Sequence, residues 1–84
     1  MKPVRVEGIV LTEADEESIL YDAKEGKVHI LNRVGAFIWD LCNGENTLED
    51  ISRAVAESFE VDEETAQKDI KEFIEELQGM DLLE

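Results

Sequence analysis

The segment KVHILNRVGAFIWDLCNGENTLEDI, residues 27–51, constrains the fold of this chain more than any other feature. It begins with the polar and apolar alternation of a half-buried strand, and at Asn32 it changes to the apolar spacing of a helix. It then pauses at NGEN before a second apolar stripe begins after Thr47. A strand followed directly by two short helices is typical of a winged helix-turn-helix, so the first question is whether the chain binds DNA.

Three short strands are predicted from residue alternation, at residues 8–14, 18–23 and 27–32. The turn between the first two is polar and acidic, and Gly26 can adopt the positive φ of a tight hairpin between the second and the third. Both connections are short enough for antiparallel neighbours, so we expect a meander. The apolar residues expected to share a face within each strand are Ile9 with Leu11, Ile19 with Tyr21, and Val28 with Ile30.

Three helices are predicted from capping residues and apolar spacing. Asn32, Thr47 and Asp62 are good N-cap residues, and Thr47 begins a TLED sequence that resembles a capping box with Asp in place of Glu. The first helix is expected to end near CNGEN, the second at about Phe59 and the third at Gly79. The three apolar stripes are Val34, Phe37, Ile38 and Leu41; Leu48, Ile51, Val55 and Phe59; and Ala66, Ile70, Phe73, Ile74 and Leu77.

The predicted fold class is α+β, winged helix-turn-helix-like, with a three-stranded antiparallel sheet followed by three helices. With 84 residues the chain is expected to form one domain over residues 1–84. Its charge argues against DNA, because 22 acidic residues against 8 basic ones give a formal net charge of -14. Such a surface repels a phosphate backbone, and the third helix is itself acidic. We therefore expect no nucleic-acid partner.

No catalytic, metal or cofactor motif is found. One cysteine and one histidine cannot close a zinc site, and the scattered glycines form no phosphate-binding loop. By alternation His29 should point away from the face of Val28 and Ile30, toward solvent or a partner, and no motif makes it catalytic. Cys42 and Trp39 are expected to be packing residues. We predict that the protein is not an enzyme and has no cofactor.

The N-terminal sequence MKPVRVEGIV lacks the apolar region and cleavage site of a signal peptide. No apolar run approaches the roughly 20 residues that cross a bilayer. Together with a single cysteine, which cannot form an internal disulfide, these features predict a cytoplasmic protein without a membrane partner.

Several packing and capping positions together resemble the PqqD family of peptide-binding modules, also called RiPP recognition elements. The resemblance covers most of the chain, from about Ile9 onward. Its closing MDLL matches the family's GLL ending, with Asp81 where glycine is common. The other matching positions are Leu31, Asn32, Gly35, Ile38, Trp39, Leu41, Cys42, Gly44, Thr47, Ile51, Asp69, Phe73 and Leu77.

The resemblance implies a peptide chaperone of natural-product biosynthesis that has no turnover of its own. Such a module captures the leader segment of a ribosomally made precursor peptide and presents it to a modifying enzyme, such as a radical SAM enzyme, a peptidase or a cyclase. The leader typically adds as a strand to the third strand, beside the third helix. The positions implied to bind it are Lys27, Val28, His29, Ile30 and Leu31 on the strand, and Asp69, Ile70, Phe73, Ile74 and Leu77 on the helix.

Some alternatives stay open at the level of sequence. Ile74 widens the apolar stripe of the third helix, so it either faces the groove or completes the core. The exposed edge can also pair with a second copy of the chain to give a homodimer, and a winged-helix regulator is the remaining alternative. Three cations and one acid between Lys24 and Arg33 favour a leader that carries Asp or Glu.

Overall fold

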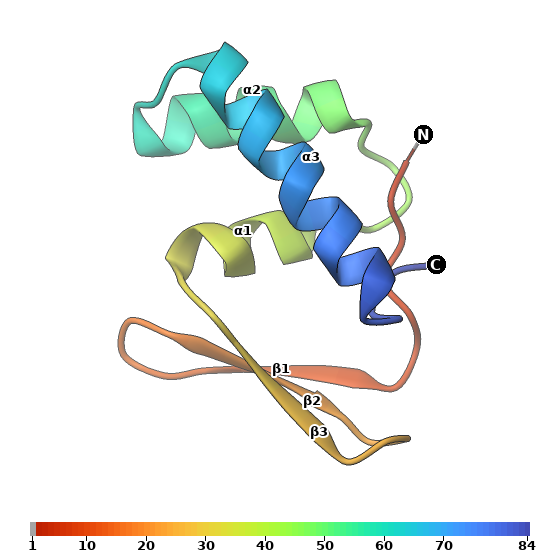
Figure 1. Ribbon diagram of the computed structural model, residues 1–84. Helices are drawn as coiled ribbons and strands as arrows, with labels where there is room; N and C mark the ends of the chain where they lie inside the picture. The colour runs from red at the N-terminus through yellow and green to blue at the C-terminus, as the bar shows by residue number, and fades with distance from the viewer. Residues whose placement is uncertain (1) are drawn as a thin grey trace.

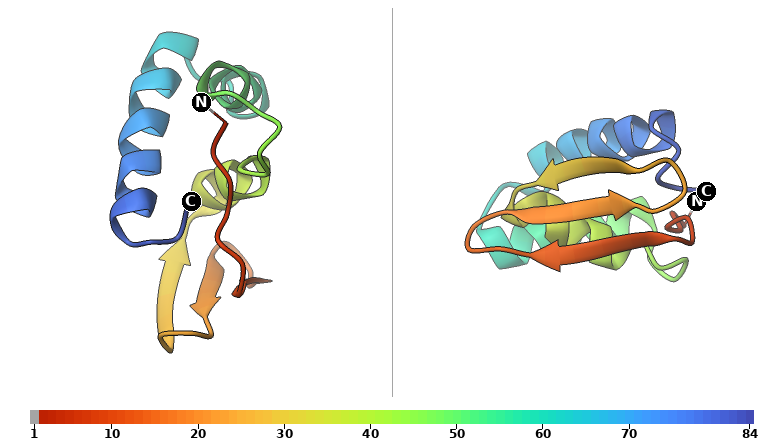
Figure 2. Two further views of the ribbon diagram at one scale, coloured as in Figure 1. Left: turned by 90° about the vertical axis from the view of Figure 1, so that its right-hand side faces the viewer. Right: turned by 90° about the horizontal axis from the view of Figure 1, so that it is seen from below.

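The computed structural model describes residues 2–84 and confirms three antiparallel strands followed by three helices (Figure 1). All three helices lie on one side of the sheet, and the views from the side and from below show that none of them covers its other face (Figure 2). No helix within residues 2–84 has the length and apolar character needed to cross a membrane. The elements are β1 (Ile9–Glu13), β2 (Ser18–Asp22), β3 (Lys27–Leu31), α1 (Arg33–Leu41), α2 (Leu48–Phe59) and α3 (Glu63–Gly79).

The inner face of the sheet is set by the register of its central strand, β2. Leu20 lies opposite Leu11 on β1 and opposite His29 on β3, so these three side chains share one face. Leu20 is fully buried and Leu31, two residues after His29, is also buried, which identifies this face as the one under the helices. His29 therefore points away from the face of Val28 and Ile30, as predicted, and its half-buried side chain lies on the helix side of the sheet.

The outer face of the sheet carries exposed apolar side chains. Val28 lies opposite Tyr21, which lies opposite Val10, and all three are exposed. Ile30 lies opposite Ile19 in the next row along the strands. All three pairs predicted to share a face do so: Ile9 and Leu11 of β1 pack against the core, whereas the pairs of β2 and β3 face away from the helices.

Each of the three helices begins directly after its predicted N-cap residue. The side chains of Asn32 and Asp62 accept the N–H of the residue three positions later, at 2.8 Å and 3.1 Å. The capping box at α2 is complete: the N–H of Asp50 donates to Thr47 Oγ1 at 3.1 Å, and the N–H of Thr47 donates to Asp50 Oδ2 at 3.0 Å. These bonds satisfy amides that the first turn of a helix leaves free.

Two helices are followed by left-handed residues that are not glycine. Glu60, after α2, has a φ of 53°, and Asp81, after α3, has a φ of 59°. Gly79 ends α3 as predicted, but it does not supply the left-handed conformation. Asp81 thus has a backbone conformation that glycine adopts at no steric cost.

The core fills the space between the sheet and the helices. The predicted packing roles of Trp39 and Cys42 are confirmed, since their exposed fractions are 2% and 0%. Phe37 and Phe59 pack edge to face, with ring centroids 5.3 Å apart. The buried apolar residues are Leu20, Leu31, Ile38, Trp39, Cys42, Ile51, Val55, Ala66, Ile70, Ile74, Leu77, Leu82 and Leu83.

The N-terminal residues 3–6 lie between the C-terminal tail and the connection from α1 to α2. The N–H of Arg5 donates to the carbonyl of Cys42 at 3.0 Å, and the N–H of Val6 donates to the carbonyl of Leu82 at 3.1 Å. We call this three-segment arrangement the terminal clasp. It fixes both ends of the described chain on the same side of the molecule (Figure 1).

Candidate functional site

β3 is an edge strand with a free side. The strand order is β1-β2-β3, so within residues 2–84 only β2 pairs with it, and half of its main-chain groups have no partner strand. In the view from below, β3 lies on the same side of the molecule as α3, whereas β1 lies on the opposite side (Figure 2). A peptide that pairs with β3 would therefore run beside a helix wall.

A cleft of about 250 Å³ lies beyond the C-terminal end of β3, among the start of α1, Val55 of α2 and α3. It is mostly apolar, with the half-buried ring of Phe73 on one wall and the exposed carboxylate of Asp69 at its rim. Asn32, the residue directly after β3, also lines it, so the end of the edge strand leads into the cleft. The remaining lining residues are Val34, Gly35, Ile38, Val55, Ala66 and Ile70.

Gly35 brings the walls of the cleft close together. A Cβ at this position would lie 3.3 Å from Oδ1 of Asn32, which is tighter than most Cβ contacts, and 3.4 Å from Cζ of Phe73, which is an ordinary contact distance. The absence of a side chain therefore leaves room for the capping bond of Asn32, next to the ring of Phe73.

The structure separates the ten predicted binding positions into three groups. Ile74 has 1% of its surface exposed, so it completes the core, and the alternative that it faces the groove is wrong. Phe73 lines the cleft, and its role in binding stays a prediction. On the edge strand lie Lys27, Val28, His29 and Ile30; the cleft is lined by Asp69, Phe73 and Ile70, of which Ile70 also belongs to the core; and in the core alone lie Leu31, Ile74 and Leu77.

The start of α1 contributes residues to the cleft that sequence reasoning had assigned to capping and packing alone. Val34 and Gly35 line it together with the α3 residues. One signal was available: glycine within a helix costs roughly 1 kcal/mol relative to alanine, so Gly35 in the first turn of α1 indicates a close contact.

The positive charge near the edge is divided between two places. Lys27 stays on β3, where its Nζ lies 3.4 Å from Oε2 of Glu25. Arg33 instead lines a different cavity, and Asp69 places a negative charge at the rim of the cleft. The predicted preference for an acidic leader therefore depends on Lys24 and Lys27 alone.

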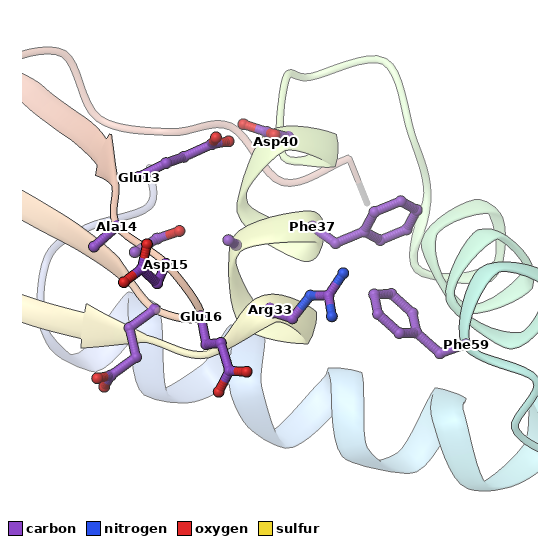
Figure 3. A pocket seen from close by; sticks show the side chains of 11 residues that line it. Glu13, Ala14, Asp15, Glu16, Arg33, Phe37, Asp40 and Phe59 are labelled. Carbon is purple, nitrogen blue, oxygen red and sulfur yellow. The ribbon is translucent and has the colours of Figure 1, made fainter.

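That second cavity has a volume of about 400 Å³ and lies between the β1–β2 connection, α1 and the end of α2 (Figure 3). Figure 3 shows Phe37 of α1 and Phe59 of α2 on one side, with Glu13 and Asp15 of the hairpin on the other. None of its eleven lining residues is a histidine, a cysteine or a lysine. Among the described residues, no three His, Cys, Asp or Glu side chains gather in a way that could hold a metal ion.

Residues 17–83 match a protein family described as coenzyme PQQ synthesis protein D (PqqD). Among solved structures, TbiB1 in complex with the TbiA(beta) leader peptide is similar, with a TM-score of 0.84 and 28% identity over 96% of this chain and 94% of that chain. Lasso peptide synthetase B1 complexed with the leader peptide has a TM-score of 0.86 over 100% and 99% of the two chains, and its 19% identity supports the fold alone. No curated protein matches the chain.

Proposed function

Because this chain belongs to the PqqD family, which matches it over residues 17–83, we propose that it is a non-catalytic adaptor that captures the leader segment of a ribosomally made precursor peptide. The observation that carries the proposal is the free edge of β3, which leads into the cleft beside α3. A solved structure that is 28% identical to this chain is named as a complex with a leader peptide, which supports the same assignment.

The proposed binding mode is strand addition. The leader backbone pairs with the free main-chain groups of residues 27–31, and each such hydrogen bond contributes roughly 0.5–1.5 kcal/mol net. Leader side chains that point inward reach the cleft, where Phe73 offers an apolar wall and Asp69 a negative rim. The main chain then supplies affinity that is independent of sequence, and the cleft supplies selectivity.

The adaptor role follows from holding one segment while leaving the rest of the precursor free. A leader fixed on β3 keeps the remainder of the peptide at a high effective concentration for an enzyme that binds the same adaptor. That enzyme is proposed to be a modifying enzyme of the pathway, such as a radical SAM enzyme, a peptidase or a cyclase. No chemical step is then required of this chain.

The test is a heteronuclear NMR titration of labelled protein with leader peptides encoded by neighbouring genes. We expect amide shifts on residues 27–31 and on the α1 and α3 residues of the cleft. Replacing Phe73 by Ala should weaken binding about tenfold, as for an anchor residue in a pocket, whereas the matched apolar-to-alanine change Val61→Ala, at an exposed position outside the cleft, should not.

Two further measurements test strand addition and distinguish leader binding from self-association. A leader whose peptide nitrogens are alternately methylated should lose binding in one of its two methylation registers, because that register removes the donors that face β3. If dilution of the protein alone shifts the β3 amides and no leader does, the adaptor proposal fails and pairing between two copies of the chain accounts for the edge.

A further inference from the structure

The outer face of β3 gives this edge a second means of selection. We infer that Val28 and Ile30 select apolar residues at two alternate positions of the bound peptide, on the face of the sheet opposite the cleft. This inference rests on the proposed function and adds a specificity that the cleft cannot supply.

The first observation is exposure. Ile30 and Val28 have 64% and 57% of their surface exposed, which makes them the most exposed large hydrophobic side chains among the described residues. Both are β-branched and lie on β3, the edge strand on the α3 side of the sheet. These two side chains therefore form exposed apolar surface on a strand that pairs with β2 on one side and, within the described part of the chain, has no neighbouring strand on the other.

The second observation is register. Val28 continues a cross-strand row that contains Tyr21 and Val10, and Ile30 lies beside Ile19 in the next row. A peptide paired with β3 extends both rows by one residue, because directly opposite side chains in a sheet lie about 4.5–5.5 Å apart at Cβ. The same two side chains that are now exposed then acquire neighbours.

The chemistry of those neighbours follows from the rows. Aliphatic β-branched and aromatic side chains pair best with Val28 and Ile30, and a charged side chain would lose hydration without gaining a partner. The two outward positions are separated by one inward residue, because side chains alternate along a strand. The expected pattern is thus apolar, any, apolar, with the middle residue directed toward the helix side.

A second copy of the chain is a poorer occupant for this face. The outer face offers two rows of three side chains, far fewer than the roughly 20–30 residues that each partner contributes to a stable interface. Each copy also carries a formal net charge of -14, which opposes face-to-face association. The edge of β3 is continuous with the proposed peptide site, so the peptide itself is the favoured occupant.

The experiment is a set of double-mutant cycles with the leader that shifts the β3 amides in the titration above. Each leader residue is replaced singly by Thr, and Kd is measured for the wild type, Val28→Thr, Ile30→Thr and the control Val10→Thr. Threonine keeps the β-branched shape, so the sheet is retained. Val10 has 54% of its surface exposed on the same face, but it lies on the opposite edge strand.

We expect two leader positions, spaced two residues apart, at which Thr weakens binding by roughly 1.5- to 5-fold, the range of a single cross-strand pair. One loss should disappear in Val28→Thr and the other in Ile30→Thr, and both should persist in Val10→Thr. Losses that persist in every variant, or the absence of such an alternating pair, would overturn the inference. In that case the β3 shifts still support the adaptor role, whereas a leader that leaves β3 unshifted removes both.

Discussion

At the scale of single residues, the backbone conformation at two helix ends conflicts with the side chains present. Glu60 and Asp81 have positive φ, a region that costs an L residue roughly 1 kcal/mol relative to glycine. Glycine at either position would remove that cost. Both residues are exposed, so their side chains add no burial that would compensate.

We predict that Glu60→Gly and Asp81→Gly each raise the free energy of unfolding by about 0.5–1 kcal/mol, as measured by urea denaturation. The control Gly26→Ala makes the reverse change. Gly26 has a φ of +68°, and no atom lies within 4 Å of a Cβ added there, so backbone strain alone should destabilise this variant. Asp81→Asn separates the loss of a negative charge from the change in backbone. A midpoint of Asp81→Gly at or below that of Asp81→Asn would contradict the explanation.

A second prediction concerns Cys42. Burial raises the pKa of its thiol from 9.0 to about 11, although nearby Arg5 lowers it in part. The folded state therefore prefers the neutral thiol, so this contribution to stability is complete below pH 9.0 and is lost as pH rises toward 11. Urea midpoints measured across this interval should fall for the wild type and fall less for Cys42→Ala. Equal slopes would show that other groups govern the alkaline loss.

At the scale of elements, the capping box of α2 couples helix formation to pH. Hydrogen bonds from the backbone N–H and the side chain of Thr47 hold the pKa of the Asp50 carboxyl below its ordinary value of 3.8. Its folded-state pKa is lowered, so the stabilisation is present above 3.8 and is lost as pH falls through the lower value. The capping box therefore stabilises the first turn of α2 less at acidic pH than at neutral pH.

We predict that Thr47→Ala lowers the free energy of unfolding by about 1 kcal/mol at neutral pH, the usual cost of losing an N-cap. The Asp50→Asn variant should lose less stability between neutral pH and pH 3 than the wild type does, because it has no carboxylate to protonate. Glu49→Gln, next to the box but outside its reciprocal bonds, is the matched control. Parallel acid curves for Asp50→Asn and Glu49→Gln would count against this role.

Local patterns predicted the elements well, because caps and alternation are short-range signals. Asn32, Thr47 and Asp62 begin helices where their side chains meet free amides. Alternation also predicted which residues of β3 share a face, but it left the direction of that face undetermined. Val28 and Ile30 are as apolar as Leu31, so only packing with the helices decides which set is buried.

The candidate site was harder to predict because it joins distant elements. On α3, the stripe of apolar residues is wide enough that Phe73 and Ile74 could exchange roles, and the structure buries Ile74 while Phe73 lines the cleft. The contribution of Gly35 depends on how closely α1 approaches α3, which no local spacing reports. The free edge of β3, by contrast, could be predicted, because β3 is the last strand of a meander.

At the scale of the whole molecule, charge and topology separate this protein from the DNA-binding domains that its strand and helix order resembles. The formal net charge of -14 repels phosphate, so the same arrangement of sheet and helices is available for a peptide. Strand addition depends mainly on main-chain groups, which are unaffected by this charge. The acidic surface is therefore compatible with the proposed strand addition at the edge of β3.

The terminal clasp has a consequence for the order of assembly. It joins segments from opposite ends of the chain, so its closure encloses nearly the whole polypeptide in one loop and carries the largest entropic penalty of any contact in the molecule. The meander and the α2–α3 pair connect near neighbours and can form earlier. β3 contains no clasp residue, so this strand can form before the two ends of the chain meet, and transient fraying at those ends can leave it intact.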